Sequence, residues 1–321
     1  MKRQHFLRAA VAATLATCIS GAWAQSYPAK PVTIVIPFPP GGTLDVIGRQ
    51  LAQKLAQQTG QTFIVDNRPG GAGTIGAIAV KNAAPDGYTL LFSPSSTTTT
   101  PMTMKSASYN IVKDFAPVAL VAKAPLAVAI NKNLPITDMK SLVAYAKANP
   151  GKMTFAIGSS GSAGHLSTEL LRRAAGIEYT IVPYKGSAPA YQDLVGGQID
   201  AFIDPVLGSQ SFAKAGQLRV IGVTSKTRLS SLPDVAAVGE TVPGYEFYSW
   251  YGLWGPAKLA PEVVSKLNTE VNKALAGDMR DKLASQGVLV SGGSVAEFVQ
   301  FQQEDMAKSQ KIITEGNIRA E

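Results

Sequence analysis

The sequence has few of the residues that carry thiol and metal chemistry. It holds one cysteine, Cys18, and two histidines, His5 and His165, among 321 residues. Cys18 and His5 fall in an N-terminal segment that we expect to be removed, which leaves His165 as the single imidazole. The mature chain therefore excludes a disulfide, a zinc site of cysteine and histidine, and any catalysis that needs two imidazoles.

Charged residues are also scarce, at 16% of the chain against 45% hydrophobic residues. The lysines and arginines are scattered among acids, with no basic stripe between aromatic residues, so we expect no nucleic-acid partner. The net charge of +8 would still help to steer anions. Beyond the N-terminal segment, no apolar run approaches the roughly 18 residues of a membrane-spanning helix.

The first 24 residues have the layout of a secretory signal peptide. Basic residues, among them Lys2 and Arg3, precede an apolar stretch and an Ala-Trp-Ala cleavage site that ends at Ala24. Cleavage there removes three basic residues and no acid, so the formal charge falls from +8 to +5. A lipoprotein box at LATC, with Cys18 as the acylated first residue, stays an alternative that Thr17 disfavours.

The rest of the chain alternates short β-rich runs with helical patterns, which predicts an α/β fold with largely parallel sheets. The expected strands are 31–38, 62–67, 88–92, 115–121, 126–131, 153–158, 177–184, 199–204, 218–225 and 245–255. The expected helices are one from residue 43, and 74–83, 141–149, 162–176, 187–197, 261–277 and 295–316. Two similar β/α sets and a proline at 125 predict two lobes. Residues 25–124 and 247–321 form the first lobe, and residues 125–246 form the second.

Two glycine-rich segments match nucleotide-binding motifs only in part. PFPPGGTLD (37–45) lacks the Lys-Ser/Thr pair that a phosphate loop needs after its last glycine. GAGTIG (71–76) fits a dinucleotide pattern, but NRPG separates it from the preceding strand and no acid ends the next one. We therefore predict no cofactor. In the first loop we expect Thr43 to cap the helix and Asp45 to lie in its first turn, where free amides would attract an anion. Helix capping alone is the alternative.

The segment 158–165, GSSGSAGH, joins an expected strand to an expected helix and clusters hydroxyls with backbone amides. Such a cluster suits a carboxylate. A secreted serine hydrolase that uses Ser160 or Ser162 with His165 is the competing hypothesis. G-x-S-x-G is absent, and His165 follows Ser162 by three residues, whereas triads gather from distant segments. His165 either bonds its own loop or contacts a ligand. Asp204, at the end of an expected strand, either caps a turn or faces a ligand.

These segments together resemble the Bug family, the periplasmic solute-binding proteins of tripartite tricarboxylate transporters. The likeness spans the mature chain and includes YPAKPVTIVIPFPPGG from residue 27, DNRPGGAG from 66, SLVAYAKANPGKMTFAIGSSGSAGHL from 141 and YSWYGLWGPA from 248. It implies a two-lobed type II periplasmic binding protein fold with the ligand cleft between the lobes. It also implies a monomeric, non-enzymatic periplasmic protein whose partners are a small carboxylate and the membrane components of such a transporter.

In the family, two loops face each other across the cleft and grip carboxylates through amides, hydroxyls and waters. The matching positions predict these ligand-binding residues: Phe38, Gly42, Thr43, Leu44, Asp45, Ser93, Ser95, Ser159, Ser160, Ser162, Ala163, His165 and Asp204. The family loop usually reads Pro-Pro-Gly-Gly-Gly-Thr-Asp, whereas this chain has Thr43 and Leu44 before Asp45. Because burying a leucine face contributes roughly 1.5 to 3 kcal/mol, we hypothesise a dicarboxylate with an apolar spacer, such as terephthalate.

Overall fold

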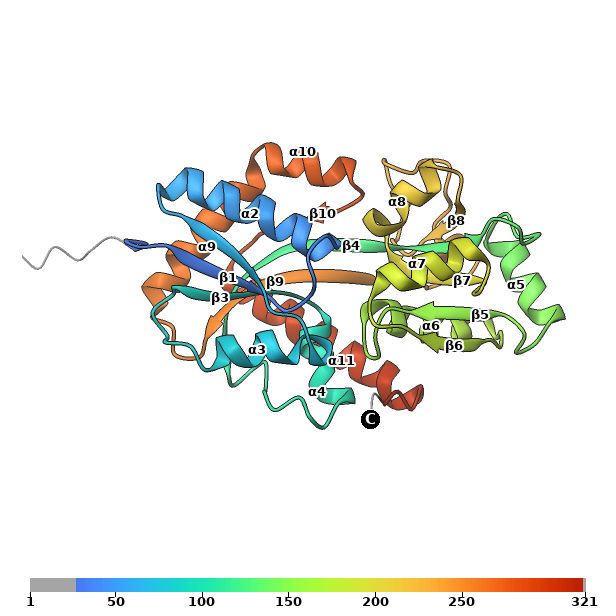
Figure 1. Ribbon diagram of the computed structural model, residues 1–321, viewed down its shortest axis with the longest axis horizontal. Helices are drawn as coiled ribbons and strands as arrows, with labels where there is room; N and C mark the ends of the chain where they lie inside the picture. Colours follow the sequence, from blue (N-terminus) through green and yellow to red (C-terminus); the bar gives the residue numbers. More distant parts are fainter. Residues whose placement is uncertain (1–26, 320–321) are drawn as a thin grey trace, which may run out of the picture.

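The computed structural model describes residues 27–319, so the expected signal peptide and Cys18 lie outside the described residues. Figure 1 shows two groups of helices and strands side by side, joined by the long strand β4. The strands are β1 (Val32–Ile36), β2 (Phe63–Asn67), β3 (Thr89–Pro94), β4 (Phe115–Asn131), β5 (Thr154–Ile157), β6 (Thr180–Pro183), β7 (Ala201–Pro205), β8 (Leu218–Val223), β9 (Tyr248–Pro256) and β10 (Leu289–Val290). The α-helices are α2 (Thr43–Thr59), α3 (Thr74–Lys81), α4 (Ser96–Thr103), α5 (Met139–Ala148), α6 (Ala163–Ala175), α7 (Ser187–Gly196), α8 (Val206–Lys214), α9 (Pro261–Ala276), α10 (Asp278–Ser285) and α11 (Val295–Glu315).

The first lobe is built on the strands β2, β1, β3, β9 and the first part of β4, in that order. β1 pairs in parallel with β2 and β3, so the loops that follow β1 and β3 leave the same edge of the sheet. Its main core packs β-branched and leucine side chains of these strands against α2 and α9. This arrangement places the 37–42 loop and the Ser93–Ser95 turn next to each other in the fold.

The second lobe repeats the design with the second part of β4 and with β7, β5 and β6, while β8 pairs along β4. β5 is parallel to β6 and β7, so the loops that follow β5 and β7 also leave one edge. A separate hydrophobic core lies between this sheet and the helices α5 and α6. The α/β, two-lobed fold expected from the sequence is confirmed.

β4 is the element that connects the lobes, and here the sequence expectation needs correction. Residues 115–121 and 126–131 were expected as separate strands, but they form one strand of 17 residues. It pairs with β9 as far as Pro125 and with β7 from Leu126 onward. Both pairings are antiparallel, so the sheet is mixed rather than largely parallel. The lobe boundaries at 124/125 and 246/247 remain predictions.

The C-terminal helix α11 touches both lobes. In the first lobe, the Trp254 indole donates to the Gln302 side chain at 2.9 Å. At the other end of the helix, Ile312 and Ile313 belong to the core of the second lobe, and Arg173 pairs with Glu315 at 3.3 Å. α11 therefore spans the joint that β4 and β9 form, as Figure 1 shows in red below the sheet.

The described part of the chain offers no membrane-spanning candidate, since none of its helices combines sufficient length with sufficient hydropathy. Within the same residues, His, Asp and Glu side chains do not gather in groups of three that could hold a metal ion.

Two glycines in helices of the second lobe make a test of this packing. A Cβ on Gly164 would lie 2.4 Å from the Ile203 carbonyl oxygen, whereas a Cβ on the exposed Gly196 would meet nothing within 4 Å. We predict that Gly164→Ala lowers the free energy of unfolding by about 1–3 kcal/mol through overpacking. Gly196→Ala should raise it by up to about 1 kcal/mol through lower chain entropy. Urea titration measures both, and equal effects of the two substitutions would contradict this packing.

Candidate functional site

The start of α2 carries a row of backbone amides without protein partners. Gly42 is the N-cap, with extended backbone and no capping side chain, and Thr43 is the first helical residue. The expectation that Thr43 caps the helix is therefore wrong. The Asp45 carboxylate instead accepts from the amide of Gly41, the residue before the N-cap, at 3.0 Å. Among residues 27–319, no protein group accepts from the amides of residues 42–45.

Asp45 braces this loop from inside the lobe. Its carboxylate accepts from the Arg49 guanidinium at 2.9 Å and from the Asn67 side chain at 3.0 Å. Burial alone would raise the pKa of Asp45, but the hydrogen bonds from Arg49, Gly41 and Asn67 outweigh it and hold this pKa below its usual range. Asp45 is thus an ionised, fully engaged group that fixes the loop, and its charge is balanced by Arg49.

Leu44 is buried, and Phe38 is partly buried. Leu44 is 8% exposed and belongs to the core of the first lobe. As the second residue of α2, its side chain lies on the helix face that packs against the sheet. The expectation that Leu44 offers a hydrocarbon surface to a ligand is not supported by this position. Phe38 is partly buried against the same core.

The start of α6 forms a second row of unpartnered amides. Ser162 caps this helix, with its hydroxyl accepting from the His165 amide at 3.2 Å. The His165 ring accepts the Gly161 amide through Nδ1 at 3.0 Å. In the part of the chain that the structure describes, the amides of Ser159, Ser160, Ala163 and Gly164 have no protein acceptor. This end of the second lobe therefore presents four free donors next to the Ser159 and Ser160 side chains.

His165 bonds its own loop through Nδ1, which is one of the two roles left open by the sequence, and contact with a ligand stays a prediction. Burial lowers the pKa of His165 to about 4, so the ring is neutral at pH 7. With Nδ1 accepting, the ring proton sits on Nε2. The Ser162 hydroxyl meets the His165 backbone and not its ring. The geometry of a nucleophilic serine activated by this histidine is therefore absent.

Asp204 stands at the end of β7, beside the α6 loop. Its two oxygens accept from the Ser187 hydroxyl at 2.9 Å and from the Tyr191 hydroxyl at 3.1 Å. Burial raises the pKa of Asp204 to about 7, against the opposite effect of these two hydrogen bonds. Gly158, which ends the β5 strand region, passes so close that a Cβ there would lie 3.3 Å from the Ser187 hydroxyl oxygen.

Tyr251 is a buried tyrosine near the α2 start that was not among the predicted residues. It lies on β9, is 2% exposed, and belongs to the hydrophobic core of the first lobe. Burial raises the pKa of Tyr251; hydrogen bonding with Ser249 and Thr43 opposes this rise, and the Asp204 charge adds to it. A residue at the α2 start and a carboxyl of the second lobe therefore both act on the pKa of this tyrosine. The aromatic-rich strand was the only sequence signal for it.

The β3–α4 turn completes the site from the first lobe. The Ser93 hydroxyl is fully buried and bonds the Thr97 hydroxyl. Ser95 is buried as well, and its amide donates to the Trp250 carbonyl at 2.8 Å. These serines, predicted as ligand contacts, are engaged in holding the turn.

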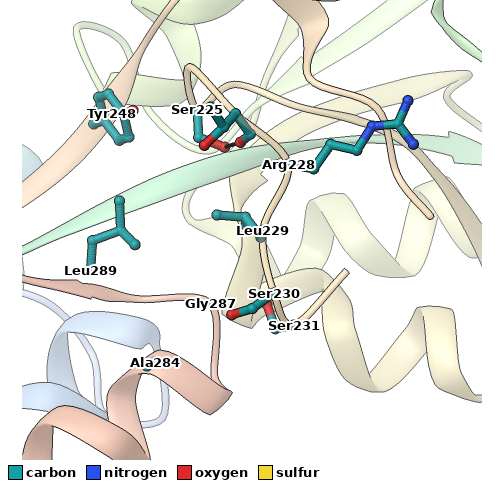
Figure 2. A pocket seen from close by; sticks show the side chains of 10 residues that line it. Ser225, Arg228, Leu229, Ser230, Ser231, Tyr248, Ala284, Gly287 and Leu289 are labelled. Carbon is teal, nitrogen blue, oxygen red and sulfur yellow. Dashed lines mark hydrogen bonds between the residues drawn. The ribbon is translucent and has the colours of Figure 1, made fainter. Parts of the chain in front are cut away.

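A separate cavity of about 320 Å³ lies where the 225–231 loop approaches the α10–β10 turn (Figure 2). Its lining includes Ser225, Arg228, Tyr248 and Leu289, and none of the predicted ligand-binding residues. Arg228, its cationic residue, is held by Glu240 at 2.8 Å. This cavity is therefore distinct from the candidate site.

Comparison with known families decides the class of protein. Residues 47–318 match the family described as the tripartite tricarboxylate transporter family receptor, TctC. The chain belongs to the TctC family. The protein is thus a periplasmic-type solute-binding receptor for small carboxylates and not an enzyme, as the resemblance to Bug proteins implied.

Individual relatives support this assignment. The chain is 37% identical to the protein BugT of Bordetella pertussis, over 78% of each chain. It is similar to an R. palustris protein solved with adipate, with a TM-score of 0.87, 35% identity, and coverage of 91% of this chain and 99% of that one. A second TctC-like structure, MatC from Rhodopseudomonas palustris with bound malate, has a TM-score of 0.81 and 29% identity over 89% and 100% of the two chains.

The pKa shifts of His165 and Asp204 in this TctC protein should change the free energy of unfolding with pH in opposite directions. The pKa of His165 falls from 6.5 to about 4 on folding, so the free energy of unfolding rises with pH between about 4 and 6.5. The pKa of Asp204 rises from 3.8 to about 7 on folding, so the folded state binds this proton more tightly. The free energy of unfolding therefore falls as the pH rises from 3.8 to about 7.

We predict that His165→Asn, which keeps an acceptor for Gly161, removes the first contribution and that Asp204→Asn removes the second. Relative to the unsubstituted protein, the change in stability from pH 5 to pH 7 becomes more negative in His165→Asn and more positive in Asp204→Asn. Urea titrations at the two pH values measure this. Parallel slopes in all three proteins would show that the shifts are absent.

Proposed function

We propose that this protein captures a small aliphatic dicarboxylate between its lobes and delivers it to the membrane components of a tripartite tricarboxylate transporter. The observation that carries the proposal is the pair of unpartnered amide rows at the starts of α2 and α6. One row belongs to each lobe, and Tyr251 lies near groups of both. A dicarboxylate has one anionic group for each row.

The chemistry of the two rows fits carboxylates. Amides at a helix start carry a partial positive charge and need an acceptor, which a carboxylate supplies through charge-assisted hydrogen bonds. Since Asp45 and Arg49 neutralise each other, the first row keeps its affinity for anions. The 37–45 loop needs neither lysine nor magnesium for this task, in contrast to a phosphate loop.

Ligand binding then drives lobe closure. A ligand that contacts one lobe in the open state and both lobes in the closed state favours closure by the difference in affinity. β4 is the strand that bends or twists in such a motion, because it runs from one lobe into the other, and the chain crosses back just before β9 begins. We propose that residues 25–124 and 247–321 form one moving lobe and that residues 125–246 form the other. We also propose that the protein is a monomer and that the segment 1–24 directs its export.

We propose an aliphatic spacer in place of the aromatic one that we hypothesised from Leu44. The structure assigns that side chain to the core, which removes the reason for preferring terephthalate. Structural relatives solved with adipate and malate support an aliphatic diacid. We therefore place adipate and malate first in the choice of ligand.

Removing one amide donor tests the proposal without adding a charge. Ala163 is the first residue of α6 after the Ser162 cap, and proline is well tolerated at this helical position because its φ angle suits it. Ala163→Pro should weaken adipate or malate binding about tenfold or more, the loss expected for one hydrogen bond to a charged group. Isothermal titration calorimetry measures the affinity.

Val295→Pro is the matched control, since Val295 is the first residue of α11 after the Ser294 cap. It should change the affinity less than twofold, while thermal melting checks that both variants fold. The proposal fails if the unsubstituted protein binds neither diacid, or if Ala163→Pro binds as tightly as Val295→Pro.

A further inference from the structure

Helix α4 is unusual in burying almost only hydroxyl side chains. Its sequence is STTTTPMT, and its serine and threonines are all buried. None of the helices expected from the sequence covers this stretch. A buried hydroxyl without a partner destabilises a protein, so each of these groups needs an acceptor.

Most of these hydroxyls find their acceptor inside the helix. Thr98 donates to the Ser95 carbonyl at 2.7 Å, and Thr100 donates to the Ser96 carbonyl at the same distance. Thr103 bonds the Thr100 carbonyl at 3.3 Å. Such bonds to the preceding turn satisfy the hydroxyl without involving the rest of the protein.

Thr99 differs, because its hydroxyl reaches the other lobe. It donates to the Gly161 carbonyl at 2.8 Å, while its acceptor in the preceding turn, the Ser96 carbonyl, lies at 3.2 Å. α4 follows β3 of the first lobe, and Gly161 lies in the loop that starts α6 of the second. The same hydroxyl thus has one acceptor across the lobes and a second within its own helix.

Gly161 is held on three sides at this point. His165 accepts its amide, Thr99 donates to its carbonyl, and a Cβ on it would lie 2.9 Å from the Thr103 hydroxyl. Its φ of +73° is in the left-handed region that favours glycine. Both peptide groups of Gly161 are therefore fixed, and they lie in the chain between the free amides of Ser159 and Ser160 and those of Ala163 and Gly164.

We propose that Thr99 is a reversible latch that couples lobe closure to the orientation of the α6 amide row. In the closed state its hydroxyl bonds Gly161 and fixes the loop. When the lobes separate, the hydroxyl returns to the Ser96 carbonyl, so opening leaves no buried donor unpaired. Thr99 is a positioning residue that acts through Gly161, and its role in binding rests on the proposed dicarboxylate capture.

Thr99→Val tests the latch, because valine keeps the shape and removes the hydroxyl. Thr98→Val is the matched control: both threonines are 1% exposed, but the Thr98 hydroxyl bonds only within α4. Stopped-flow measurements with adipate and malate should show that Thr99→Val raises the dissociation rate about three- to tenfold, as expected for one hydrogen bond. Thr99→Ser should restore it, and Thr98→Val should leave it within twofold.

A second measurement needs no ligand. Nitroxide labels on Gln57→Cys in α2 and Lys147→Cys in α5, both exposed, report the distance between the lobes by electron paramagnetic resonance. Thr99→Val should shift the distribution of the ligand-free protein toward longer distances, whereas Thr98→Val should not.

The latch is refuted if Thr99→Val and Thr98→Val give the same distance distribution. It is also refuted if they share one dissociation rate, or if serine fails to rescue. Should the unsubstituted protein bind neither diacid, the proposed function fails, while the label distances still decide the latch.

Discussion

The structure depends on leaving two rows of backbone amides without protein acceptors. Such amides cost stability when they are shielded from water, so the surrounding residues must hold them in place without pairing them. Asp45 does this for the first row by bonding Gly41 and Arg49. His165 and Ser162 do it for the second. The side chains therefore shape the loops, and the backbone amides stay free, as the proposed capture of a carboxylate requires.

This arrangement changes the interpretation of several polar residues in the loops. The polar groups that a motif search singles out, such as Asp45, Ser93 and His165, are bonded inside the protein. Asp204 is bonded too, with Ser187 and Tyr191, and its raised pKa keeps part of it uncharged near pH 7. An anion-binding site can therefore contain an aspartate. A carboxyl group that is protonated, or that accepts hydrogen bonds from neighbouring groups, repels a carboxylate ligand less than an exposed and charged one does.

Much of the fold followed from sequence, because strongly periodic segments such as 43–55 and 261–277 form the expected helices. β4 was split in two because Pro125 reads as a break, although proline is tolerated where a strand changes partners. α4 was missed because threonine is a poor helix former and Pro101 lies inside the helix. Leu44 and Tyr251 show the limit for the site: burial and cross-lobe contacts depend on which face a residue takes, and spacing in one loop does not determine that.

The most direct measurement of the central claim is an amide-resolved NMR titration of the mature protein with adipate and, separately, malate. The account predicts that the largest shifts in the ¹⁵N–¹H spectrum occur at the unpaired amides of residues 42–45 and of Ser159, Ser160, Ala163 and Gly164, in both lobes at one ligand stoichiometry. Shifts confined to one lobe, or centred on the 225–231 and 284–289 segments around the separate cavity, would contradict it.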